Sequence, residues 1–356
     1  MVLNTPSSPD EAVPATRIDA FIRGLPKTEL HMHLEGSLEP ELLVQLAARN
    51  DRKLRWTSAR ELRNAYQFSN LRSFLDLYYE GCEVLVTEQD FYDLTHAYLR
   101  RAVADGVIRA EVFVGPQSFT ARGVPIAAII GGVLMAMDDA IREHGLSAGL
   151  IVTAQRHRTE AEAFELLEQI RPWADRILAI GMGGAELGNP PSKFVNFFRA
   201  CRQQGFRITI HAGEEGPAAY VREAVEVLGV DRVDHGIACL DDPELVRMMV
   251  GSRIPLTVCP ISNVHLKVVA SLARHPLRRL LQAGLHVTVN SDDPAYFGGY
   301  VSENLIACQR ALGLTIAELL TLVRNGFTAA FMSEDEKMAA RSRLDAYVSQ
   351  FDKAWP

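Results

Sequence analysis

The sequence of 356 residues lacks several features that mark other protein classes. It has only five cysteines and no C-x-x-C pair, which excludes a disulfide framework or zinc ribbon and predicts buried free thiols in a reducing compartment. It has no run rich in lysine and arginine, and 37 basic against 44 acidic residues give a net charge of −7, so no nucleic-acid partner is expected. Its apolar runs are short and interrupted by charge, so no membrane span is expected.

The N-terminal segment differs in composition from the rest of the chain. Residues 1–17, MVLNTPSSPDEAVPATR, lack the apolar core of a signal peptide and are predicted to form a flexible tail. Residues 18–356 contain no low-complexity linker and no internal repeat, so a single domain is expected there. We therefore expect a cytoplasmic protein. The residues leave the oligomeric state open, and a homo-oligomer is compatible with them.

Eight short segments rich in β-branched and aliphatic residues are predicted to be strands. They cover residues 28–34, 108–114, 147–153, 176–182, 206–211, 232–235, 255–259 and 285–290. Stretches with helical periodicity separate them, and eight such units in one α/β domain predict a (β/α)8 TIM barrel. The first connection, about 38–106, is too long for one helix and predicts a helical insertion over the barrel mouth. The region from Thr315 onward is predicted to form terminal helices.

The first polar motifs lie at predicted strand ends, where barrel enzymes build their active sites. In TELHMHLEG, His31 and His33 are two residues apart, so both face one side of the strand, and neutral imidazoles there suit a divalent metal such as zinc. In HAGEEGP, His211 ends the fifth strand and Glu214 follows within reach of a metal-bound water. The structural alternatives are histidines satisfied in the core and an ordinary strand-to-helix turn.

Two further motifs add polar side chains to the same rim. His235 ends the sixth strand in RVDHG, whereas Asp234 alternates to the other face and is expected to be a structural hydrogen-bond acceptor. The eighth strand ends in Asp292 and Asp293, which could cap a helix or form an Asx turn. Alternatively, one of this pair completes a metal site and the other accepts a hydrogen bond from substrate. Each motif is weak alone, but together they predict one metal site.

The segments TELHMHLEG, HAGEEGP, RVDHG, PLTVCPISN and VTVNSDDPAYFGGY resemble the adenosine deaminase-like branch of the metal-dependent amidohydrolases, and the adenine deaminases within it most closely. The resemblance implies hydrolytic deamination of a 6-aminopurine, with adenine giving hypoxanthine and ammonia. It implies one zinc ion on His31, His33, His211 and Asp292. It further implies that Glu214 donates a proton and that His235 orients or deprotonates the water. The resemblance also assigns purine binding to Asp293.

We expect Glu35 and Gly183 to join Asp293 as substrate-binding residues, although the sequence departs from the adenine deaminase pattern near two strand ends. After the second strand, this sequence has Gly115 where adenine deaminases have an acid and Phe119 where they have a histidine. After the fourth strand, it has Gly183, Gly184 and Ala185 before Glu186, where Asp-Ser-Ser is common. These changes predict a larger and more apolar pocket, which makes deamination of N6-substituted adenines, or of adenosine, an alternative.

Two alternatives belong to other functional classes. An amidohydrolase acting on another ring or an ester often holds two metals bridged by a carboxylated lysine on strand four, but RILAIGM contains no lysine, which favours one metal. A catalytically silent purine-binding barrel would lack at least one metal or acid residue, and the sequence retains them all.

Overall fold

A computed structural model describes residues 17–354, with side chains up to residue 351. Of the tail predicted for residues 1–17, all but Arg17 lies outside the described residues, and Arg17 begins the first helix. Eight strands form one parallel sheet in the order β1 to β8. They are β1 (Lys27–His33), β2 (Val107–Val114), β3 (Ser147–Gln155), β4 (Ile177–Gly183), β5 (Arg207–Ala212), β6 (Arg232–His235), β7 (Pro255–Val258) and β8 (His286–Val289). Every predicted strand is confirmed, with ends that differ by at most two residues.

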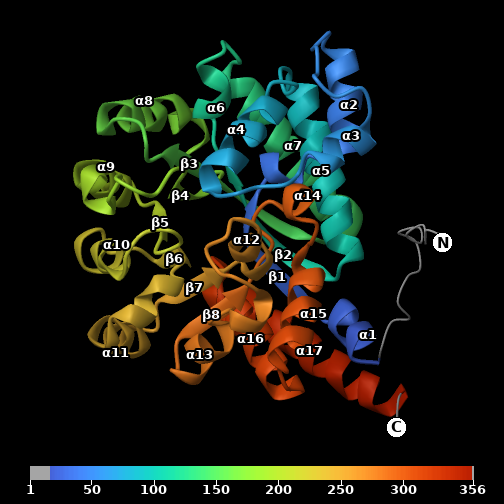
Figure 1. Ribbon diagram of the computed structural model, residues 1–356, viewed down its shortest axis with the longest axis vertical. Coiled ribbons are helices and arrows are strands. Elements are labelled where there is room, and N and C mark those ends of the chain that lie inside the picture. The colour runs from blue at the N-terminus through green and yellow to red at the C-terminus, as the bar shows by residue number, and fades with distance from the viewer. Residues whose placement is uncertain (1–16, 355–356) are drawn as a thin grey trace, which may run out of the picture.

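Helices surround the strands, and Figure 1 shows α7 to α11 following one another around the central barrel. The helices of the described chain are α1 (Arg17–Gly24), α2 (Pro40–Arg49), α3 (Ala59–Asn64), α4 (Leu71–Cys82), α5 (Glu88–Ala104), α6 (Gln117–Thr120), α7 (Ile126–His144), α8 (Glu160–Ile170), α9 (Val195–Gln203), α10 (Ala218–Arg222), α11 (Pro243–Ser252), α12 (Pro260–His265), α13 (Leu277–Gln282), α14 (Pro294–Phe297), α15 (Val301–Leu312), α16 (Ile316–Ala329) and α17 (Glu334–Ala354). This arrangement confirms the predicted (β/α)8 barrel.

The long connection after β1 divides into two parts. Its last helix, α5, packs against α7 and β2 and is the ordinary crossover helix of the first unit. The insertion proper is therefore α2 to α4. Five side chains of α4 line the cavity at the carboxyl ends of the strands, as predicted for an insertion over the mouth: Leu71, Phe74, Leu75, Tyr78 and Tyr79.

The strands carry different residues on their two faces. On β1, Leu30 packs outward against Ala329 and Ala330, so the period of two turns Glu29, His31 and His33 inward. Within the barrel, Phe113, Ile151 and Ala179 form a separate apolar cluster with Phe331. Both faces are buried, as expected for parallel strands covered by helices.

The barrel closes between β8 and β1 partly through residues of the predicted site. The backbone of Asp292 donates to the carbonyl oxygen of His31 and accepts from the amide of His33, both at 2.9 Å. Lower in the seam, the Asn290 side chain accepts from the amide of Leu30 at 3.0 Å, and the Glu29 carboxylate accepts from Ser291. Barrel closure therefore places Asp292 directly beside the two histidines of β1.

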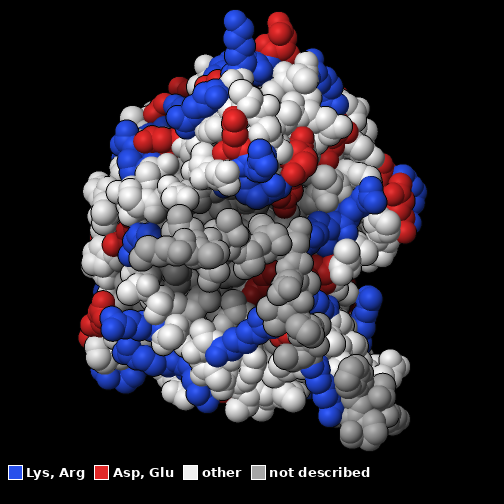
Figure 2. All heavy atoms as spheres, turned by 45° about the vertical axis from the view of Figure 1, so that its right-hand side comes forward, with Lys and Arg blue, Asp and Glu red and all other residues white. Residues whose placement is uncertain are grey.

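Three surface and compositional predictions can be compared with the structure. All five cysteines are buried and free, as predicted. No helix in residues 17–354 is long and apolar enough to span a membrane. On the face in Figure 2, basic and acidic side chains are interspersed, in keeping with their similar numbers in the sequence.

A buried ion pair crosses the barrel interior and gives a stability prediction. Arg232 donates to Glu111 Oε2 at 2.7 Å, and neither side chain is exposed. Glu111→Ala would remove the nearest carboxylate from two guanidinium groups, those of Arg232 and Arg109. It would leave the buried Arg232 with the more distant Asp234, at 3.7 Å, as its carboxylate partner, so the free energy of unfolding should fall by about 3–5 kcal/mol. Glu165→Ala, at an exposed position, should change it by about 0.5 kcal/mol or less. Denaturant titration measures both, and equal stability of the two variants would contradict the importance of the pair.

Candidate active site

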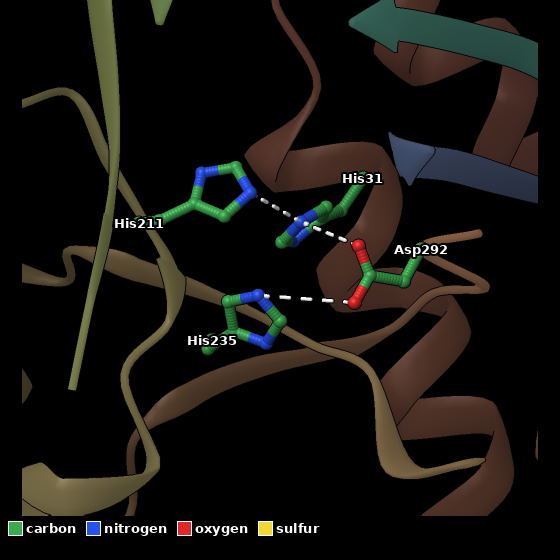
Figure 3. A group of neighbouring side chains, drawn as sticks. All are labelled: His31, His211, His235 and Asp292. Carbon is green, nitrogen blue, oxygen red and sulfur yellow. Dashed lines mark hydrogen bonds and ion pairs between the residues drawn. The ribbon is translucent and has the colours of Figure 1, made fainter. Parts of the chain in front are cut away.

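Side chains from four distant parts of the chain meet at the carboxyl ends of the strands, and Figure 3 shows four of them, His31, His211, His235 and Asp292. The Nε2 atom of His211, on β5, lies 3.0 Å from Nε2 of His31 and 3.0 Å from Nε2 of His33. The Oδ1 atom of Asp292, after β8, lies 3.4 Å from Nε2 of both β1 histidines. The structure thus brings together all four residues predicted to bind the metal.

Polar groups behind the cluster determine which ring nitrogen of His31 and His211 faces its centre. The Nδ1 atom of His31 donates to the carbonyl oxygen of Thr257 at 3.1 Å and to its hydroxyl oxygen at 3.0 Å. The Nδ1 atom of His211 faces Asp234 Oδ2 at 3.4 Å. Protons on Nδ1 leave the Nε2 lone pairs directed at one another, as in sites where the outer hydrogen bond fixes a metal-binding tautomer.

This donor set fits a divalent cation. Nε2 lone pairs that face one another at 3.0 Å repel unless a positive charge lies between them. Zinc bound by tetrahedral ligands at about 2.0–2.1 Å holds those ligands about 3.3 Å apart, close to the separations found here. The remaining oxygen of Asp292, Oδ2, accepts from the Ser262 hydroxyl at 2.6 Å, which directs Oδ1 toward the histidines.

His235 and Glu214 form the second part of the site. His235 Nε2 lies 3.5 Å from Glu214 Oε2 and 3.9 Å from Asp292 Oδ2. His235 has a left-handed backbone, with φ of 63°, and Asp292 has one with φ of 65°. Such strained conformations in residues other than glycine concentrate at functional sites.

The expected position of Asp234 is wrong. It does not lie on the face opposite the site but inside the barrel, where it accepts from Thr209 and Thr257 at 2.7 and 2.8 Å. Strand alternation accounts for Asp234, and the left-handed backbone of His235 breaks the alternation and returns that ring to the same side. The role of Asp234 as a hydrogen-bond acceptor is confirmed.

Burial and neighbouring charges set the protonation states of the site. Burial, followed by the charges of Asp292 and Glu186, raises the pKa of Glu214 well above its usual value. Burial and the charge of Asp292 do the same for the pKa of Asp293. Burial lowers the pKa of His235 well below its usual range. Although burial opposes it, the nearby His31 holds the pKa of Asp292 low. The site therefore favours a neutral His235, an ionised Asp292, and protonated Glu214 and Asp293.

The three residues predicted to bind substrate occupy different positions. Asp293 and Gly183 line the cavity, and a Cβ on Gly183 would lie 3.5 Å from the His211 ring. Asp293 Oδ1 is buried and has no hydrogen-bond partner among the described residues, and Gly36 leaves room for it because a Cβ there would collide with that carboxyl group. Glu35 is not among the lining residues, and its Oε1 accepts from the amide of Gly115 at 2.9 Å.

The cavity encloses about 610 Å³ of space, including its open part, and has two kinds of lining. Its apolar part comes from α4 and Leu266. Beside Gly115 the lining is polar, because Ser118, Thr153 and Gln155 fill that side, contrary to the expected apolar rim. Phe119 turns away from the cavity and packs edge-on against Phe91.

Sequence reasoning missed several supporting residues. Thr257 and Ser262 orient His31 and Asp292, and Glu186 accepts four hydrogen bonds from the loop that carries Glu214. Ser262 lies within the CPISN motif, Thr257 lies two residues before that motif, and Glu186 follows a predicted strand end, so position alone could have marked all three as candidates.

The fold and the buried histidine and aspartate cluster define a (β/α)8 barrel of the metal-dependent hydrolase type. The model of the family described as adenosine deaminase matches residues 26–347, and the chain belongs to this family. An adenine deaminase of Rhodopseudomonas palustris (strain BisB18) is 64% identical over 335 residues, which cover 94% of this chain and 98% of that protein.

Two solved structures share this fold. The crystal structure of an adenine deaminase from Arthrobacter aurescens has a TM-score of 0.90 and 45% identity, and the match covers 91% of this chain and 99% of that chain. A zinc-bound amidohydrolase from Burkholderia ambifaria has a TM-score of 0.87 and 31% identity, covering 98% of this chain and 96% of that chain. The predicted family resemblance is confirmed.

Proposed function

We propose that the protein catalyses the hydrolytic deamination of adenine, in which water replaces the 6-amino group to give hypoxanthine and ammonia. The convergence of three imidazole Nε2 atoms and one carboxylate oxygen at the floor of a cavity that also presents Glu214 and Asp293 carries this proposal. The adenine deaminases named above, one of them 64% identical to this chain, support adenine as the substrate.

We assign His31, His33, His211 and Asp292 as the ligands of one zinc ion. The shared contacts at 3.0 and 3.4 Å around His211 Nε2 and Asp292 Oδ1 support this set. His235 can replace His33 in a second possible group, but it faces the other oxygen of Asp292, at 3.9 Å. When bound, the zinc supplies a nucleophile at neutral pH by lowering the pKa of water.

Glu214 and His235 transfer the protons of the reaction, Glu214 as a donor and His235 first as an acceptor. The neutral His235 ring lies between Glu214 and Asp292, where its Nε2 atom can accept a proton from the attacking water and hold it near C6. The protonated Glu214 carboxyl donates to N1 of the purine, which removes the negative charge that attack would otherwise place on the ring. The proton on His235 is then available to the departing amine.

The remaining acids hold the purine in place. The protonated Asp293 carboxyl has an unused buried oxygen and can donate a hydrogen bond to a ring nitrogen, which presents only a lone pair. Gly183 lets the ring lie close to His211 because no side chain intervenes. Glu35 supports this end of the pocket through Gly115, and its buried Oε2 has no hydrogen-bond partner in the described part of the chain.

Room beside the glycines supports N6-substituted adenines as a second candidate substrate class. A Cβ on Gly115 would approach no atom closer than 3.7 Å, and α4 provides an apolar wall across the mouth. The polar groups of Ser118 and Gln155 oppose this candidate, because an alkyl chain next to them would leave polar atoms without partners. We therefore rank adenine first.

A panel of purines tests these assignments. The zinc-loaded enzyme is incubated with adenine, adenosine and N6-alkyladenines, and release of ammonia or amine is measured. We expect kcat/KM for adenine to exceed the others by about 100-fold, because an added group that leaves the polar atoms of Ser118 and Gln155 without partners should cost about 1–3 kcal/mol. A larger kcat/KM for an N6-alkyladenine would contradict the substrate, and purine binding without turnover would indicate the silent barrel.

We also propose that residues 18–356 form one domain and that the reaction takes place in the cytoplasm. A single sheet and a contiguous hydrophobic cluster from Phe21 to Leu344 support the first proposal. Five free thiols support the second.

A further inference from the structure

We propose that Glu186 is a positioning residue for the reaction, because its buried carboxylate fixes the loop of residues 213–216 and thereby holds Glu214 at the purine. Glu186 lies in the loop that follows β4. Strand β4 is the neighbour of β5, the strand that carries His211. The inference rests on the proposed deaminase function, and it assigns no chemical step to Glu186 itself.

Four consecutive backbone amides converge on the Glu186 carboxylate. The amide of Gly213 donates to Oε1 at 2.6 Å, and those of Glu214, Glu215 and Gly216 donate to Oε2 at 3.0, 2.8 and 2.8 Å. Successive amides directed at one point form a concave anion site, and here the anion is a side chain of the same protein. The loop therefore takes its shape from Glu186.

The anchor is buried and its charge is accommodated. Glu186 is 1% exposed, so its carboxylate depends on these amides in place of water. The buried Arg156 lies 4.0 Å from Glu186 and donates to the carbonyl oxygen of His211 at 2.6 Å and to that of Asn189. Arg156 thus links the loop that contains Glu186 to the end of β5, where His211 lies.

The Glu214 side chain has few restraints of its own. Its Oε2 lies 3.5 Å from His235, and its Oε1 is buried with no hydrogen-bond partner among residues 17–354. An acid that must meet a ring nitrogen within hydrogen-bond distance needs a fixed backbone when its side chain is free. The amide bond of Glu214 to Glu186 supplies this restraint directly.

A glutamine at this position cannot reproduce the anchor. In either orientation, its NH₂ group faces the amide of Gly213 or those of Glu214, Glu215 and Gly216, where two donors oppose each other. Even the better orientation loses one hydrogen bond and removes the negative charge that the amides surround. The loop should shift by about 1 Å while the metal ligands stay in place.

Steady-state kinetics of zinc-loaded Glu186→Gln with adenine test the proposal. We expect kcat to fall by about 100-fold, because a misplacement of about 1 Å near the reacting atoms costs this much. KM should change by less than about threefold and zinc should remain at one per chain, since the ligands of substrate and metal are untouched. In a Glu214→Gln background the same substitution should lower kcat by less than about threefold, because both changes disable one group.

A matched control separates positioning from stability. Asp90 is also a buried carboxylate that accepts from two loop amides, Val86 at 2.9 Å and Thr87 at 2.7 Å, but it lies at the start of α5 and does not line the cavity. Asp90→Asn should lower the melting temperature and leave kcat unchanged. Gly216→Ala crowds the anchor from the other side, since its Cβ would lie 2.6 Å from Glu186 Oε1, and should also lower kcat without raising KM.

Several results would overturn the proposal. They are an unchanged kcat in Glu186→Gln, a KM that rises in step with the loss of kcat, or an additive loss in the Glu214→Gln background. If Glu186→Gln does not fold, Gly216→Ala becomes the test. A normal kcat in Gly216→Ala, or a failure of that variant to fold, also overturns the proposal. Failure of the wild-type enzyme to deaminate adenine would instead refute the proposed function.

Discussion

Glu214→Gln is expected to lower kcat for adenine by about 10²–10⁴-fold, the usual contribution of a positioned general acid. Glutamine matches the size of glutamic acid but has no transferable proton for N1. Glu214 lies in the cavity beside His235 and is not one of the proposed metal ligands, so zinc should remain at one per chain. Rapid-mixing kinetics and metal analysis on the same preparation measure both quantities.

The neighbouring glutamate provides the control for this experiment. Glu215 follows directly in the loop and is half-buried, but it does not line the cavity that contains Glu214. Glu215→Gln should therefore keep kcat within about threefold of the wild-type value, as expected for a substitution away from the reacting groups. Turnover retained by Glu214→Gln, or lost equally in both variants, would remove Glu214 from the mechanism.

Asp292→Ala is expected to abolish turnover together with metal binding. Among the described residues, the substitution removes the one carboxylate found within 3.4 Å of both β1 histidines, and it leaves three imidazole ligands. Zinc occupancy should fall at least about tenfold, since even loss of outer-shell partners of a metal ligand costs 10–100-fold in affinity. The backbone bonds of Asp292 to β1 remain available to alanine, so the barrel seam should persist.

Asp293→Ala is the matched control, because the two acids are adjacent and both buried. Its carboxyl faces the purine side of the cavity, so this variant should retain zinc and show a raised KM for adenine. Atomic absorption on dialysed proteins separates the two cases. Full zinc occupancy in Asp292→Ala, or loss of zinc only in Asp293→Ala, would reverse the roles assigned to the two residues.

The sequence predicted the parts of the structure that depend on period and position. Strand ends were recognisable because apolar runs stop at His211, His235 and Asp292, and barrel topology brings such ends to one rim. The alternation of two placed His31 and His33 correctly on one face of β1. Applied backward from His235, the same rule misplaced Asp234, because the left-handed backbone of His235 breaks the alternation and no local pattern marks that conformation.

Other features depend on contacts between distant segments and could not be read from the chain. Glu186 contacts residues 213–216 only once β4 and β5 are paired, and no spacing in the sequence predicts that contact. The polar wall next to Gly115 arises because Gln155, on another strand, donates to Ser118 at 2.8 Å. The apolar face of α4 was visible in the sequence, but the part of that face that covers the cavity was not.

Anomalous X-ray diffraction at the zinc edge tests the central assignment most directly. Crystals of the protein purified with zinc should show one strong peak per chain, about 2.0–2.2 Å from Nε2 of His31, His33 and His211 and from an oxygen of Asp292. A peak bound by His235 in place of His33, a second peak of equal height, or no peak among these side chains would contradict it.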